Sequence, residues 1–155
     1  MVPATITVAM LIGALAAGGT SQAPVPPAPT AEGAPGLEGS AWNAVEVYGT
    51  PVAMDANAPD RAPHLVFGKE GRVSGADGCN RLTGPYTVKA NGLTFGQLAG
   101  TRMACPDNDD LAKRFQAALK GTSHWSIVSG RLEIYGATGK PLAVFERRAA
   151  DVKQP

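Results

Sequence analysis

The sequence is short of charged residues, and its charges nearly cancel. Asp, Glu, Lys and Arg make up 17% of the 155 residues, where a typical soluble domain has about a quarter. The formal net charge is +1, so the chain lacks the concentrated basic face that nucleic-acid binding requires. The 19 glycines and 13 prolines favour many turns and short strands over a helical bundle. A chain of this length holds one ordinary domain.

The first 36 residues lack basic side chains and cysteine. Residues 1–23 contain the apolar run ATITVAMLIGALAAGG, which has the length of a secretory signal and is too short for a comfortable membrane-spanning helix. Residues 24–36 are rich in proline and alanine, which predicts a solvated linker. No Lys or Arg precedes Arg61, so the usual basic start of a signal is missing, and no cysteine precedes Cys79, so a lipoprotein anchor is not expected. We expect export to a periplasmic or extracellular location, with membrane association only through the signal segment.

Residues 37–148 show an alternation of apolar and polar side chains, and residues 149–155 form a polar tail. The alternating segments are HLVFG, GLTFG, HWSIV, RLEIY and PLAVF, which begin at residues 64, 92, 124, 131 and 141. Such alternation is typical of strands with one buried and one solvated face. Short turns rich in glycine separate several of these segments, and they favour antiparallel pairing.

Residues 107–121 have helical spacing instead. The apolar residues that would share one helical face are Leu111, Phe115, Ala118 and Leu119. We expect Asp107 to cap the start of this helix and Gly121 to end it in a left-handed conformation. The acidic residues near its start do not match a calcium loop, because Leu111 would occupy a ligand position. The predicted fold class is therefore mainly β: a small antiparallel β-barrel-like sheet, with one amphipathic helix (about residues 107–121) inserted before the last three strands.

The two cysteines, Cys79 in GADGCNRLTGPY and Cys105 in GTRMACPD, allow three interpretations. A catalytic thiol needs a histidine base nearby, and only His64 and His124 are present. A zinc site needs four ligands, and two cysteines with two scattered histidines make a poor set. A disulfide suits an exported domain with an even number of cysteines, and it would close a loop of about 25 residues. We favour the disulfide, with free thiols and a reactive thiol as the alternatives.

Packing expectations follow from glycine and from the large apolar residues. The glycines at which we expect sharp bends between strands are Gly75, Gly78 and Gly84. The large residues that we expect to point inward are Trp42, Phe67, Phe95 and Trp125. These side chains predict a filled interior, whereas a pocket on the order of several hundred Å³ would favour a small-ligand carrier.

A disulfide between the two cysteines would bring three polar residues into one neighbourhood. These are Asn80 and Arg81 beside the first cysteine and Arg102 near the second. Guanidinium groups bind carboxylates and other anions through paired hydrogen bonds. We regard Asn80, Arg81 and Arg102 as candidate ligand-binding residues, with hydrogen bonding to loop carbonyls and to carboxylates near the helix start as the alternative. No carboxylate pair, Ser–His–Asp set or metal cluster can be assembled, so no catalytic or metal residues are assigned.

The segments VSGADGCNRLTGPYTV and LTFGQLAGTRMACPD, followed by a helix and by strands ending in GKPLAVFE, resemble the META domain of the HslJ-like family. The opening LEGSAWNAVEV is also similar, so the resemblance covers residues 37–147. It implies a small, β-rich, exported or envelope-associated domain without established enzymatic activity. Bacterial members of this family are linked to heat-shock induction and to novobiocin resistance, and related domains occur in secreted parasite proteins. Many members are lipoproteins, and this sequence departs from them by lacking the lipidated cysteine.

The expected function is that of a non-enzymatic exported protein, related to envelope stress, that binds a protein or a small ligand. The alternative is a small-ligand-binding β-barrel carrier. We expect a monomer that has no cofactor and no nucleic-acid partner, and whose partner is an envelope protein or small ligand that the sequence does not identify.

Overall fold

The computed structural model describes residues 36–54 and 58–149. The expected signal segment (1–23) and almost all of the expected linker (24–36) lie outside the described residues, as do residues 150–155 of the polar tail. Within the described ranges, no helix is long and apolar enough to cross a membrane.

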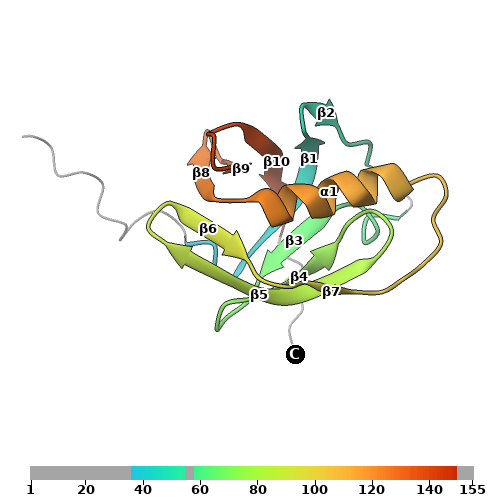
Figure 1. Cartoon of the computed structure of the whole chain (residues 1–155), viewed down its shortest axis with the longest axis horizontal. Coiled ribbons are helices and arrows are strands. Elements are labelled where there is room, and N and C mark those ends of the chain that lie inside the picture. Colours follow the sequence, from blue (N-terminus) through green and yellow to red (C-terminus); the bar gives the residue numbers. More distant parts are fainter. Residues whose placement is uncertain (1–35, 55–57, 150–155) are drawn as a thin grey trace, which may run out of the picture. The chain divides into compact units, whose positions relative to one another are not determined.

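Ten strands and one helix make up this part of the chain (Figure 1). The strands are β1 (Ser40–Val47), β2 (Thr50–Pro51), β3 (His64–Phe67), β4 (Arg72–Ala76), β5 (Arg81–Lys89), β6 (Gly92–Phe95), β7 (Ala99–Gly100), β8 (His124–Val128), β9 (Arg131–Tyr135) and β10 (Pro141–Arg147). The helix, α1 (Asp109–Gly121), precedes the last three strands. This arrangement confirms the predicted fold class.

The sheet closes on itself. Its strands follow the order β10-β9-β8-β6-β5-β4-β3-β1-β2, and β7 pairs with β5 beside this series. β1 also pairs with β10, in an antiparallel register that runs from Trp42 opposite Arg147 to Val47 opposite Ala143. The first long strand and the last strand of the chain therefore complete a barrel-like ring.

The join between β6 and β8 is the shortest strand pairing among the described residues. Gly92 lies opposite His124, and the Leu93 N–H donates to the Ser123 carbonyl at 3.0 Å. α1 packs against β6 on one side of this join and against β10 and β1 beyond it (Figure 1). The helix therefore supports the ring near the β6–β8 pair, where the strands share the fewest paired residues.

Apolar side chains fill the interior of the ring. Trp42, Phe67, Phe115 and Phe145 are each at most 1% exposed. Edge-on aromatic contacts join two of these rings, Phe115 and Phe145, at 6.1 Å between centroids, a geometry that aromatic pairs prefer. Burial of Trp42 and Phe67 confirms the expectation of large inward residues.

Two of the expected core aromatics lie at its margin instead. Phe95 and Trp125 are partly buried and pack against the core. The indole N–H of Trp125 donates to the Ala90 carbonyl at 3.2 Å, at the turn between β5 and β6. A polar ring nitrogen with a partner on the surface keeps this side chain at the edge.

The start of α1 differs from the prediction. Asn108, not Asp107, occupies the N-cap position, and no side chain makes a capping hydrogen bond there. The Asn108 amide donates instead to the Gly78 carbonyl at 3.4 Å. The prediction of Asp107 as cap is wrong, because a contact with a distant turn positions the first residue before the helix.

The end of α1 also differs, whereas its buried face agrees with the prediction. Gly121 is the last helical residue, and Thr122 follows in an extended conformation. The Thr122 hydroxyl donates to the Ala118 carbonyl at 2.8 Å, so a threonine side chain takes the place of the expected left-handed glycine. The fully buried residues of the predicted face are Phe115, Ala118 and Leu119, and Leu111 is partly buried.

Of the three glycines expected at bends, Gly78 lies in a turn, with φ of +101°. Gly75 and Gly84 lie inside β4 and β5, so the expectation of bends there is wrong. A Cβ added at Gly75 would lie 2.0 Å from the His64 carbonyl oxygen. Glycine at this position allows β3 and β4 to approach closely.

Candidate functional site

One buried carboxylate holds the turn of residues 77–80 between β4 and β5. Asp77 is 0% exposed. Its Oδ1 accepts the backbone N–H groups of Cys79 (2.9 Å) and Asn80 (2.6 Å), and its Oδ2 accepts the side-chain amide of Gln116 from α1. Burial of a carboxylate is costly unless its oxygens are satisfied, and here three donors reach them. Asp77 therefore ties the turn to the helix.

The predicted disulfide provides a second tie. Cys79 and Cys105 are joined, with their Cα atoms 5.9 Å apart, a separation typical of disulfides. The bond links the 77–80 turn to the segment between β7 and α1. With both cysteines in this bond, neither is available as a reactive thiol.

Asn80 continues the same network along the β7–α1 segment. Its Oδ1 accepts the Met103 N–H at 2.7 Å and the Thr101 hydroxyl at 3.4 Å. The Thr101 oxygen in turn accepts the Arg81 backbone N–H at 3.1 Å. The side-chain oxygen of Asn80 is thus engaged within the fold, and it holds residues 101–103 beside β5.

Two surface pockets flank β7. The first, which we call the His64 pocket, has a volume of about 610 Å³ and is lined mainly by Asp60, His64, Ser74, Ala76, Arg81 and Thr83. The second, which we call the Arg102 groove, has a volume of about 1120 Å³ and is lined mainly by Phe95, Leu98, Arg102, Met103, Gln116 and Lys120. Both are also lined by Leu82, Ala99, Gly100 and Thr101. β7 and the residue after it therefore form the wall between them.

The three candidate ligand-binding residues are distributed over both pockets. Arg81 lines the His64 pocket, whereas Asn80 and Arg102 line the Arg102 groove. Neither arginine forms an ion pair with another residue that the structure describes. Their backbones are neighbours, since the Thr101 N–H donates to the Arg81 carbonyl at 3.1 Å, but the side chains lie on opposite sides of β7.

The Arg102 groove combines cationic and apolar lining. Arg102 and Lys120 supply positive charge, and no Asp or Glu is among its lining residues. Phe95, Leu98 and Met103 supply apolar surface, and Met103 is 51% exposed. An exposed flexible methionine beside an aromatic ring is typical of adaptable binding surfaces.

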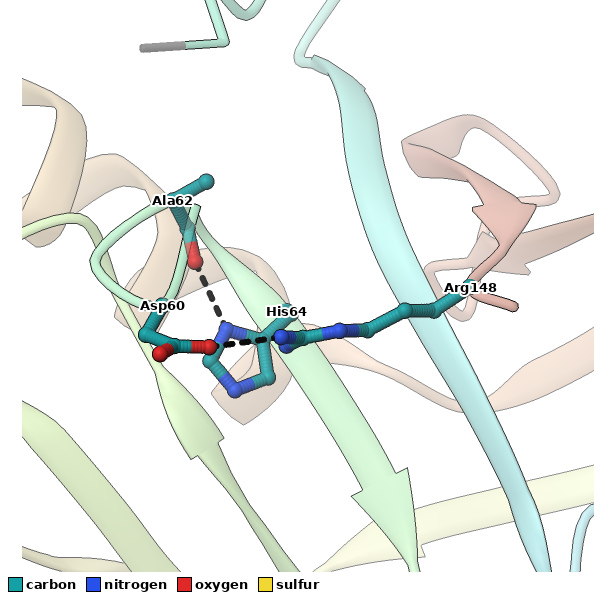
Figure 2. Close-up of polar contacts among 4 residues, drawn as sticks. All are labelled: Asp60, Ala62, His64 and Arg148. Atoms are coloured by element: carbon teal, nitrogen blue, oxygen red, sulfur yellow. Dashed lines mark hydrogen bonds and ion pairs between the residues drawn. The ribbon is translucent and has the colours of Figure 1, made fainter. Parts of the chain in front are cut away.

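The His64 pocket has a different character, which Figure 2 shows in part. The Nδ1 atom of His64 lies 2.7 Å from the Ala62 carbonyl oxygen, so this nitrogen carries the hydrogen. Asp60 and Arg148 form an ion pair at 2.7 Å beside the imidazole (Figure 2). Burial lowers the pKa of His64, and the charges of Arg148 and Arg81 act in the same direction, while the Ala62 hydrogen bond and Asp60 oppose them.

Several of these residues escaped the sequence analysis. Asp77 had a local signal, since Asp before Gly commonly bonds to backbone N–H groups two residues on, but its burial depends on Gln116 from a distant helix. The sequence offers His64 as a possible base for Cys79 or as a poor zinc ligand, and nothing in it places this residue beside Arg81. Among the described residues, no group of three or more His, Cys, Asp or Glu side chains is arranged to hold a metal ion.

Comparisons with known proteins agree with this architecture. The sequence model of the META domain matches residues 35–149. No curated protein matches the chain.

Solved structures share the fold. An NMR structure of a protein from Burkholderia xenovorans is 24% identical, with a TM-score of 0.58 over 81% of this chain and 99% of that one. Another NMR structure of a protein is 27% identical, with a TM-score of 0.56 over 70% and 88% of the two chains. The crystal structure of a DUF4847 family protein from Bacteroides vulgatus is 16% identical, with a TM-score of 0.55 over 73% and 95%.

Proposed function

The chain belongs to the META domain family, and from this premise we propose that it is a non-enzymatic exported protein that acts in envelope stress. We propose further that it acts by binding a small amphiphilic anion in the Arg102 groove. The stress would be heat or exposure to an antibiotic, as the resemblance to HslJ-like proteins implies. The observation that carries the binding proposal is the lining of the groove, which combines Arg102 and Lys120 with apolar side chains and includes no Asp or Glu.

The lining defines the chemistry of the ligand. A carboxylate or similar anionic head would be held by Arg102, whose guanidinium donates paired hydrogen bonds. An apolar body would contact Phe95, Leu98 and Met103. The volume of about 1120 Å³ slightly exceeds the usual range of small-molecule sites, so the groove offers room for an extended ligand.

The interior of the ring is a poorer place for this ligand. Trp42, Phe67, Phe115 and Phe145 occupy it, and of the residues in the core cluster only Leu82 also lines the groove. The carrier alternative, with a ligand enclosed by the strands, is therefore less favoured than binding between β7 and α1.

Export is supported by the Cys79–Cys105 disulfide, since such bonds persist in oxidising compartments and are rare in the cytosol. A periplasmic or extracellular site of action follows from this proposal. Fractionation of cells that express the full chain tests it, because the protein should appear in the periplasm or medium with the disulfide formed.

Binding is tested by NMR titration of the protein with octanoate, and with octanol as a control ligand of the same chain length that carries no charge. Octanoate should shift signals of residues 95–103 and 116–120. The Arg102→Ala substitution should weaken octanoate binding by about tenfold, as expected for loss of a charged hydrogen bond. Lys140→Ala serves as control, because Lys140 is an exposed cation in the turn before β10. Equal binding of octanoate by the Arg102→Ala variant would contradict the proposal.

The stress role needs a separate experiment. A strain without the gene should grow less well than its parent after heat shock or with novobiocin, and the wild-type gene should restore growth better than Arg102→Ala. Capture of an envelope protein that competes with octanoate would identify a protein segment as the natural occupant of the groove.

A further inference from the structure

We infer that the His64 pocket is a second binding site, for a small polar anion whose carboxylate or phosphate group is held between His64 and Arg81. This site is separate from the Arg102 groove, and its argument does not depend on the function proposed above. It rests on strand register, on the orientation of one imidazole and on the charges that surround it.

Strand register places the side chains of His64 and Arg81 on one face of the sheet. His64 of β3 lies opposite Ala76 of β4, and Ala76 lies opposite Arg81 of β5. Residues directly opposite each other in antiparallel strands point to the same face. Their neighbour Leu65 is buried in the core, so this row faces outward. His64 and Arg81 thus stand two strand spacings apart, or about 9–10 Å along the sheet.

A small residue forms the floor between them. Ala76 is only 3% exposed although it lies on the outer face, so the surrounding side chains and loop enclose it. Ser74 and Thr83 lie opposite each other in the next row of the same face, and both line the pocket. Their hydroxyl groups can bond to the polar body of a ligand. The pocket therefore offers the Arg81 guanidinium and, once His64 is protonated, its Nε2–H as donors to an anion, with two hydroxyls beside them.

The imidazole is oriented for this role. Nδ1 of His64 lies 2.7 Å from the Ala62 carbonyl oxygen, so Nδ1 keeps its hydrogen as the donor to this oxygen. Nε2 is therefore the atom that gains or loses a proton. In the neutral ring Nε2 repels an anion by its lone pair, and in the protonated ring it donates a hydrogen bond. An anion at Nε2 therefore favours protonation of His64, so binding and proton uptake are coupled.

The charged groups around His64 leave the site cationic. Asp60 is its acidic neighbour, and Arg148 offsets that charge through the 2.7 Å ion pair (Figure 2). Arg81 of β5 also lines the pocket, and its positive charge acts on His64. On β1 the residue opposite His64 is the uncharged Asn43, and the lining residues of β4 carry no charge. The positive charges also lower the pKa of His64, after burial as the main cause, so without an anion beside it the ring takes up a proton less readily than a histidine in water.

Isotope-labelled full-length protein, titrated with three probes, tests the site. The probes are glucuronate, inorganic phosphate and neutral glucose. Glucuronate, phosphate or both should shift signals of residues 64, 74–76 and 81–83 in a saturable way, and glucose should not. The stronger of the two anions identifies the preferred head group. Absence of saturable shifts with both anions would overturn the proposal.

Variants locate the binding. Arg81→Ala should weaken binding by about tenfold or more, because it removes a charged donor. The matched control is Arg72→Ala, since Arg72 is exposed in β4 and lines neither pocket. Arg102→Ala should leave glucuronate binding unchanged, which separates this site from the groove. An equal loss of anion affinity in Arg72→Ala and Arg81→Ala would show that only the overall surface charge matters, and it would refute the site.

The pH dependence provides a readout that a structural role would not give. Glucuronate stays ionised over the range used, and its binding should tighten as the pH falls from about 7.5 to about 5.5, because protonation of Nε2 turns this atom into a donor to the anion. His64→Gln should bind with little dependence on pH while its spectrum remains that of a folded protein. Unchanged pH dependence in His64→Gln would show that His64 does not contact the anion.

Discussion

Removal of the Asp77 carboxylate should destabilise the fold more than any surface substitution. In Asp77→Ala the N–H groups of Cys79 and Asn80 and the amide of Gln116 all lose their acceptor. An unsatisfied buried donor costs about 1–3 kcal/mol. Because Cys79 and Asn80 in this turn are only partly buried, the turn can relax and admit water to part of this network, so we expect a total loss of about 3–5 kcal/mol in the free energy of unfolding.

A conservative variant separates the two oxygens. In Asp77→Asn the remaining side-chain oxygen can still accept the two backbone N–H groups of the turn. The new side-chain NH2 group then faces the amide of Gln116, so two donors meet and that hydrogen bond is lost. This variant should lose about 1–2 kcal/mol. Asp107→Asn is the matched control, because Asp107 is exposed and precedes the helix; its effect should stay within about 0.5 kcal/mol.

Urea unfolding of the oxidised protein, followed by tryptophan fluorescence, measures these differences. The disulfide must remain intact in all variants, so that its loss does not add to the effect of the substitution. If Asp77→Ala unfolds within about 1 kcal/mol of the wild type, the carboxylate does not hold the turn, and the account of this site is wrong.

Other expectations concern the disulfide, the helix and the pH profile. Reduction of the Cys79–Cys105 bond, which spans a sequence separation of 26, should lower the free energy of unfolding by about 3 kcal/mol; a double Cys→Ala variant should match it, and equal stability of oxidised and reduced protein would contradict the tie. Phe115→Ala removes a side chain that is 0% exposed and should cost about 3–5 kcal/mol in urea unfolding; a loss typical of a surface site would mean that α1 does not pack on the ring. Burial holds the pKa of His64 below its usual value, so the unfolded chain binds the proton first and stability should decline as the pH falls below about 6.5. His64→Gln should remove part of this decline. If the dependence of the free energy of unfolding on pH is unaltered in this variant, the imidazole is exposed to solvent and not buried.

The strands could be predicted because their signal is local. Leu65 and Phe67 are buried, while His64 and Val66, which alternate with them, are partly buried. The sequence HLVF shows the same alternation of apolar and more polar or half-buried positions. The buried face of α1 was predicted for the same reason. Its ends were not, because Asn108 bonds to Gly78 and Thr122 bonds back to the last turn. Such side-chain choices among several possible caps depend on the packed structure.

The candidate site was predicted only in part, because its geometry depends on register. The cysteine pairing followed from their number and the expected compartment, and the neighbourhood of Arg81 and Arg102 followed from it. That the two side chains lie on opposite sides of β7 is a consequence of pairing between β5 and β7. The approach of His64 to Arg81 requires three strands in one register. A shift of one residue in any of them would turn a side chain to the opposite face.

The pairing of β1 with β10 has a consequence for the order of folding. Val47 and Ala143 are opposite each other, so the ring closes through contacts between residues roughly a hundred positions apart, and contacts of such long range form slowly. The loop between the two cysteines is much shorter and can close early. On the export proposed above, a chain that crosses the membrane with its amino end first would therefore form the disulfide-linked part before β10 is available. Until then the edges of β1 and β9 stay unpaired and open to other strands, so a chaperone that shields β1 during this interval should raise the yield of folded protein.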